Sequence, residues 1–117
     1  MSTVAKGNYH RKKTQEWLES EGYIVAPLEV TRRIFVPGKD GKPDRVVFSK
    51  KDLWGADLIA RNGTELIFIQ VKANPGHIAE GMKELSRGIW PPWVQRWVVH
   101  WPPRTRTQDG PRVEVVQ

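Results

Sequence analysis

Two short apolar runs lie on either side of an Asn-Gly pair in residues 55–72, which read GADLIARNGTELIFIQVK. Asn-Gly between apolar runs favours a tight turn, because both residues tolerate the backbone conformation that a two-residue hairpin needs. We therefore predict a strand over Ala56–Ala60, a turn over Arg61–Thr64 and a second strand over Glu65–Lys72. Pairing across this turn brings the start of the first strand level with the end of the second.

Three polar residues meet at the open end of this predicted hairpin. Side chains alternate along a strand, so Gln70 and Lys72 point to one face while Val71 points into the core. Asp57 lies near their level in the first strand. The side-chain oxygens of Asp57 and Gln70, with the Val71 carbonyl, can bind Mg²⁺, for which Mn²⁺ is a substitute. Lys72 can orient or help deprotonate water and offset phosphate charge, so the pattern indicates metal-assisted phosphodiester hydrolysis.

The motifs GADLIA at 55–60 and IFIQVK at 67–72 resemble the signature of the PD-(D/E)XK nuclease superfamily. Within it, about residues 6–86 resemble the archaeal-type Holliday junction resolvases and their phage and bacterial relatives. The resemblance implies a restriction-endonuclease-like fold, in which helices flank a mixed central β-sheet. It also implies a homodimeric, Mg²⁺-dependent endonuclease that cuts four-way DNA junctions in recombination and repair. Its expected location is the cytoplasm of a bacterial cell or of a phage-infected host.

The resemblance assigns roles to three residues of the hairpin. Asp57 matches the family's metal-binding aspartate and Lys72 matches its lysine. Gln70 stands where the family usually has glutamate, so the catalytic set is Asp57, Gln70 and Lys72. Because Gln70 keeps an oxygen ligand but lacks the negative charge, we expect the metal to bind more weakly than at a site with two carboxylates.

The acid that the family carries on its first helix is missing from the expected position. Arg11 stands there, and the neighbouring His10 lies on the inner stripe of the predicted helix. Thr31 lies near a hydroxyl position of some resolvases. His10, Arg11 and Thr31 are therefore possible contributors to the site, and Glu29 is a weak candidate for the missing acid.

On either side of the hairpin, the chain predicts one α/β (α+β) domain over residues 1–117 in the order αββββαββ. A single globule of 117 residues should have a radius of gyration of about 13 Å. The helix at 10–21 should end at Gly22 and bury the stripe His10, Thr14, Trp17 and Leu18. The next predicted element is a strand at 23–30, in which Pro27 favours an edge position or a bend. The others are a basic hairpin at 31–51, a helix at 77–87, and strands at 94–101 and 112–116 within a Trp-rich segment at 90–117.

The charge balance favours a polyanionic partner. Nineteen Lys and Arg against thirteen Asp and Glu give a formal charge of +6, and nucleic acid is the common cellular polyanion. The chain has no cysteine, which excludes disulfides, thiolate zinc sites and a cysteine nucleophile. No apolar run approaches the ~20 residues of a membrane span, and neither a membrane nor a small-molecule cofactor is expected. The predicted DNA-binding residues are Lys6, Arg11, Lys12, Lys13, Arg32, Arg33, Lys50 and Lys51.

Other interpretations stay open at this point. The chain could be a different nuclease with the same fold, such as a nicking, flap or restriction-type enzyme. It could also be a catalytically silent DNA-binding protein, because Gln70 and Arg11 both depart from the acidic set. Trp90, Trp93, Trp97 and Trp101 could stack on unpaired bases, although packing within the monomer or across a dimer interface is favoured for them.

Overall fold

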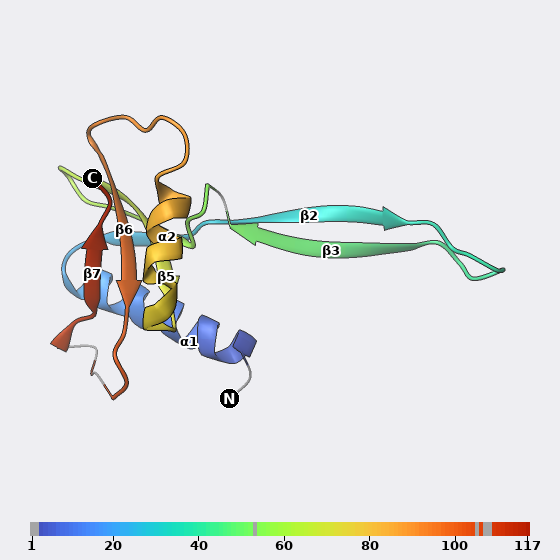
Figure 1. The fold of residues 1–117 in the computed structure, drawn as a ribbon, viewed down its shortest axis with the longest axis horizontal. Helices are drawn as coiled ribbons and strands as arrows, with labels where there is room; N and C mark the ends of the chain where they lie inside the picture. The colour runs from blue at the N-terminus through green and yellow to red at the C-terminus, as the bar shows by residue number, and fades with distance from the viewer. Residues whose placement is uncertain (1–2, 53, 105, 107–108) are drawn as a thin grey trace.

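A five-stranded mixed sheet with two helices forms the body of the protein, which is therefore an α+β fold (Figure 1). The structure is a computed structural model that describes residues 3–52, 54–104, 106 and 109–117. For residues 3–8, 29–32 and 49–52 it describes the backbone but not the side chains. No helix in these described ranges is long and apolar enough to cross a membrane.

The central sheet has the strand order β1-β4-β5-β6-β7. Neighbouring strands are antiparallel except β5 and β6, which are parallel and are connected through the second helix. The Asn-Gly turn predicted between the apolar runs is confirmed, because Asn62 Oδ1 accepts from the N–H groups of Thr64 and Glu65 between β4 and β5. The strands are β1 (Ile24–Pro27), β4 (Leu58–Arg61), β5 (Leu66–Lys72), β6 (Val94–His100) and β7 (Arg112–Val115).

The two helices are α1 (Thr3–Ser20) and α2 (Ile78–Leu85), and a short 3₁₀ turn, η1 (Pro75–His77), precedes α2. The α1 helix begins seven residues before the predicted start at His10. It stops as predicted at Gly22, whose φ of 94° is the left-handed conformation that glycine adopts without strain.

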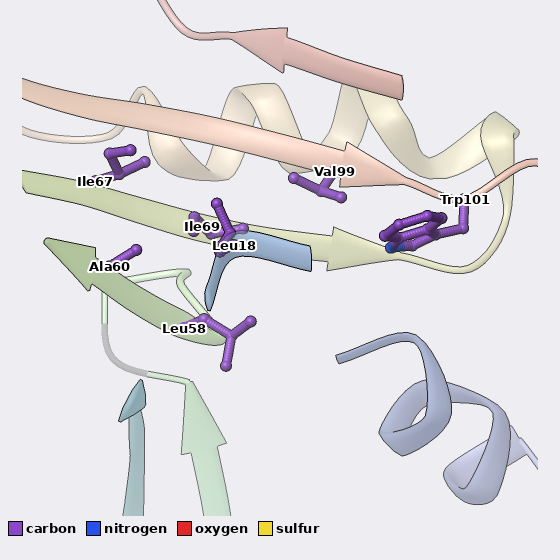
Figure 2. Packing of buried hydrophobic residues seen from close by; sticks show 7 residues of the cluster. All are labelled: Leu18, Leu58, Ala60, Ile67, Ile69, Val99 and Trp101. Carbon is purple, nitrogen blue, oxygen red and sulfur yellow. The ribbon is translucent and has the colours of Figure 1, made fainter. Parts of the chain in front are cut away.

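The α1 and α2 helices cover opposite faces of the sheet. Side chains alternate along β5, so successive residues pack into two hydrophobic clusters, one beneath each helix. Ile67 and Ile69 pack with Leu18 of α1, whereas Phe68 packs with Ile78 and Leu85 of α2. Figure 2 shows the first cluster, which consists of Leu18, Leu58, Ala60, Ile67, Ile69, Val99 and Trp101.

Distant parts of the sequence meet in this first cluster. Trp101, only 1% exposed, donates from Nε1 to Thr14 Oγ1 at 2.8 Å. Trp97 packs against the same cluster. The prediction that Trp97 and Trp101 pack within the monomer is confirmed, and so is the buried stripe of α1 at Thr14 and Leu18.

The predicted basic hairpin forms a separate two-stranded sheet of β2 (Glu29–Val36) and β3 (Arg45–Asp52). Figure 1 shows this β2–β3 arm projecting away from the body. The projection explains why the radius of gyration is 16.8 Å, with extents of 56 × 35 × 26 Å, so the value expected for a globule is wrong. The predicted order αββββαββ is also wrong, because the described chain has five strands between its helices and the arm supplies two of them.

The surface of the β2–β3 arm is apolar as well as charged. Large apolar side chains are exposed on the arm, including Phe35 at 64% and Phe48 at 66%. The sequence predicts an edge strand or a bend at Pro27, and β1 is an edge strand of the central sheet. The predicted single strand at 23–30 is wrong, because β1 ends at Pro27 and β2 begins at Glu29. Beside β1, the Tyr23 hydroxyl donates to Glu65, and this hydrogen bond raises the pKa of Tyr23 to about 12.

Replacing Leu18 with alanine tests the first cluster. Leu18 is fully buried against β4 and β5, so Leu18→Ala should lower the free energy of unfolding by about 2–5 kcal/mol, as measured by urea denaturation. Glu16→Ala, on the exposed side of the same helix, is the matched control and should stay within about 0.5 kcal/mol of the wild type. A similar loss in both variants would contradict the packing described for α1.

Candidate active site

Asp57 lies at the point where the pairing of β4 with β5 ends. Its backbone N–H donates to the carbonyl of Ile69 at 2.8 Å, although the strand register pairs Ile69 with Leu58. Two successive residues thus oppose one residue of β5, which is the arrangement of a β-bulge. The Asp57 carboxylate accepts from the Val71 N–H through Oδ2 at 2.8 Å. The side chain of Asp57 is therefore held at the end of β5 by the backbone of that strand.

Gln70 and Lys72 lie together on the face of β5 that α2 covers. Gln70 is 3% exposed. A Cβ atom at Gly81 of α2 would lie 2.6 Å from Gln70 Oε1 and 3.2 Å from Lys72 Cε. The absence of a side chain at Gly81 therefore lets the helix approach both residues. The structure thus brings Asp57, Gln70, Val71 and Lys72 to one end of the sheet, as the sequence predicts.

Glu84 is a fourth polar side chain at this site, and the sequence analysis missed it. Gln70 Nε2 donates to Glu84 Oε2 at 2.6 Å. Glu84 also lies over the segment that precedes Asp57, since a Cβ at Gly55 would be 3.5 Å from the Glu84 Cβ. Its position in the helix was a usable signal, because Glu84 follows Gly81 by three residues and so shares its side of α2. We call Asp57, Gln70, Lys72 and Glu84 the polar cluster.

His100 supports the end of β5 from the neighbouring strand. The parallel register pairs it with Lys72, and its Nδ1 lies 3.1 Å from the Lys72 carbonyl oxygen. His100 is 4% exposed. It contacts the backbone of Lys72, so its role here is structural.

The polar cluster contains oxygen donors suited to a hard cation. Among the residues with described side chains, no three His, Cys, Asp or Glu residues form a metal-binding group. Glu84 nevertheless contacts the Gln70 amide, and the Asp57 carboxylate accepts from the backbone of the next residue of β5. Gln70 Oε1 is buried and has no hydrogen-bond partner in the described part of the chain. Carboxylate and amide oxygens are the donor types that Mg²⁺ prefers.

The other predicted site residues lie on different elements. His10 and Arg11 are half-buried on α1, and the His10 ring contacts Tyr9 with centroids 5.4 Å apart. Thr31 lies on β2 of the arm opposite Lys50, and its side chain is outside the described part of the structure. The contributions predicted for His10, Arg11 and Thr31 stay predictions.

The predicted DNA-binding residues fall into two groups. Lys6, Arg11, Lys12 and Lys13 lie on α1, and Lys13 Nζ sits 4.6 Å from the centroid of the Trp101 ring. The second group lies on the β2–β3 arm, where its members are separated by only a few residue pairs of the strand register. This group consists of Arg32, Arg33, Lys50 and Lys51. On the arm, the Arg33 side chain is exposed. The side chains of Lys6 on α1 and of Arg32, Lys50 and Lys51 on the arm are outside the described part.

Comparison of the chain with protein-family models, with curated proteins and with solved structures gives no match.

Replacing Glu84 with leucine tests the hydrogen bond that joins α2 to β5. Glu84→Leu leaves the buried Gln70 Nε2 without its acceptor, so the free energy of unfolding should fall by about 1–3 kcal/mol in urea denaturation. Glu80→Leu is the control, because Glu80 is exposed on the same helix and loses at most about 1 kcal/mol of helix-dipole stabilisation. Equal losses in the two variants would mean that the Gln70–Glu84 contact does not contribute to stability.

Proposed function

We propose that this chain is a Mg²⁺-dependent, structure-selective DNA endonuclease that resolves four-way junctions, with a restriction-endonuclease-like fold. The observation that carries the proposal is the meeting of Asp57 with Gln70 and Lys72 at the end of β5. This is the residue pattern of the PD-(D/E)XK signature, on an antiparallel β1-β4-β5 unit followed by a helix and a parallel strand. Both features support a nuclease of that superfamily.

Each member of the polar cluster has a distinct chemical role in this proposal. Asp57, Gln70, Glu84 and the Val71 carbonyl would hold Mg²⁺, which when bound acts as a Lewis acid toward a phosphodiester. The Glu84 carboxylate supplies the negative charge that Gln70 lacks in comparison with a glutamate. The Lys72 ammonium would offset phosphate charge and orient the attacking water.

The β2–β3 arm is well placed to bind DNA near these residues. The N–H of Leu28, just before β2, donates to the Asp57 carbonyl at 2.8 Å, so the base of the arm is joined to the polar cluster. Arg33, Lys39, Lys42 and Arg45 are exposed along the arm. Phosphate contacts from such residues position DNA without reading its sequence, which suits recognition of a junction by its shape.

A homodimer completes the proposal. A two-fold dimer presents two equivalent sites, so it can cut two strands of a four-way junction symmetrically.

The direct test is cleavage of a labelled four-way junction beside linear duplex of equal length, with Mg²⁺ and with EDTA. We expect paired cuts in the junction only, and only with Mg²⁺. Cleavage of both substrates would instead indicate a nicking, flap or restriction-type nuclease. Tight binding without cleavage under Mg²⁺ or Mn²⁺ would indicate a catalytically silent DNA-binding protein.

Replacing Lys72 with alanine should separate cleavage from binding. Lys72→Ala removes the ammonium that serves the water and phosphate, so junction cleavage should fall by about 10²–10⁴-fold. Junction binding, measured by gel shift in EDTA, should stay nearly unchanged because it depends on many phosphate contacts. Lys83→Ala, an exposed lysine of α2, should keep both activities. Joint loss of binding and cleavage in Lys72→Ala would contradict this division of roles.

Replacing Gln70 with glutamate should make stability depend on Mg²⁺. Gln70→Glu puts a second carboxylate where Gln70 Nε2 now lies 2.6 Å from Glu84 Oε2, and like charges at that distance repel without a cation. The melting temperature should therefore fall in EDTA and recover with Mg²⁺.

The matched control for this substitution is Gln15→Glu. Gln15 Nε2 donates to Glu19 Oε1 at 2.9 Å on the exposed surface of α1, where solvent screens the repulsion. Its melting temperature should respond little to Mg²⁺. An equal response in both variants would count against a cation site at Gln70.

A further inference from the structure

A large aromatic pocket lies beside the polar cluster. It has a volume of about 940 Å³ and is lined by Trp54, Phe68, Trp90 and Trp93, with Glu84 and Arg87 among its polar side chains. This volume falls at the upper end of the range of small-molecule sites, about 300–1,000 Å³. We call this space the aromatic pocket.

Three rings of the pocket hold one another in place. The centroid of Phe68 is 5.0 Å from that of Trp90 and 5.6 Å from that of Trp54. Trp54 and Trp90 meet edge to face, with centroids 6.2 Å apart. Trp54 and Trp93 are nevertheless 62% and 68% exposed. The pocket thus has a packed aromatic floor and two large aromatic rings still open to a ligand.

The backbone presents Trp54 in an unusual conformation. Its φ is 54°, which is rare and unfavourable for a bulky residue. The ring of Trp54 is largely exposed rather than buried. Gly55 follows with a φ of 78°, so the two residues form a turn before β4 that leaves the Trp54 ring exposed at the pocket.

The pocket and the polar cluster are formed in part by the same residues. Glu84 and Gly55 line the pocket, and Glu84 is also the hydrogen-bond partner of Gln70. Phe68 precedes Gln70 by two residues on β5 and so lies on the same face of the strand. A ligand in the pocket is therefore next to the residues proposed to act on a phosphodiester.

The aromatic rings and one exposed cation of the pocket suit a nucleotide. Arg87 is exposed and lines the pocket, which Glu84 also borders. The Arg96 guanidinium lies 5.5 Å from the Trp90 ring centroid and donates to the Leu85 carbonyl, so it helps to hold that ring in place. Aromatic faces stack on bases of any sequence while neighbouring cations accompany the backbone.

We propose that the aromatic pocket binds an unpaired nucleobase of the DNA strand that enters the polar cluster. The inference rests on the proposed function, since it names the feature by which the site selects its substrate. A four-way junction is fully base-paired, but the pairs at its branch point can lose a stacking neighbour. Their bases therefore unpair at lower cost than bases within a duplex and become available to the pocket. Stacking thus adds selectivity to a phosphate grip that carries no sequence information.

Binding of bulged DNA in EDTA tests the pocket without any cleavage. The two probes are a labelled duplex with one unpaired adenine and the same duplex with an abasic residue at that position, measured by fluorescence anisotropy. The wild type should bind the adenine bulge about tenfold more tightly, which is typical of one base stacked on an aromatic side chain.

Two variants remove exposed rings of the pocket. Trp93→Ala and Trp54→Asn should each bring the two affinities close together, and asparagine suits the positive φ at position 54. Ile24→Ala, which removes an exposed apolar side chain of β1 that does not line the pocket, should keep the preference for the adenine bulge. Circular dichroism and thermal melting of each variant establish that it is folded.

The outcomes separate the pocket from the nuclease. Equal wild-type affinities, or a preference that survives in both pocket variants, would overturn the pocket proposal. If the pocket variants instead turn a dimer into a monomer in sedimentation, the pocket binds a second copy of the chain and the proposal fails. A base preference without cleavage of any DNA would keep the pocket and overturn the nuclease, whereas junction cleavage without a base preference would do the reverse.

Discussion

The hydrogen bond from the Val71 N–H to the Asp57 carboxylate is the contact on which the arrangement of this site depends. A backbone N–H at the end of a central strand needs an acceptor, and here a side chain supplies it. The Gln70 and Lys72 side chains on either side of Val71 face α2, because side chains alternate along the strand. The Asp57 carbonyl also accepts a hydrogen bond from the N–H of Leu28, which lies at the base of the β2–β3 arm. Asp57 therefore connects β5, the base of the arm and the polar cluster.

The second requirement is the close approach of α2 to β5. Gly81 permits it, since any Cβ there would meet the Gln70 amide. With the helix at this depth, Glu84 reaches Gln70 from above the sheet. A carboxylate at position 70 would repel Glu84, whereas an amide donates a hydrogen bond to it. The glutamine and the helix glutamate are thus chemically complementary, and each explains the presence of the other.

Local pattern predicted much of the fold and part of the site. The Asn-Gly turn, the cap at Gly22 and the alternation of β5 depend on near neighbours, and these predictions are confirmed. Glu84 was missed because its role depends on how deeply a separate helix packs. The arm's separation from the sheet was missed for a similar reason, since its strands alternate like any others and pair only with each other.

The arrangement of charge and apolar surface has a physical logic of its own. An isolated two-stranded hairpin is marginal in water, and this one exposes Phe35 and Phe48 as well as its cations. The aromatic pocket likewise leaves Trp54 and Trp93 open. The base of the arm is joined to the polar cluster through Leu28 and Asp57, and the pocket shares Glu84 with that cluster. A polyanion with flat apolar bases would contact cations and rings at once, which is why a nucleic acid suits these surfaces better than a partner that is only charged or only apolar.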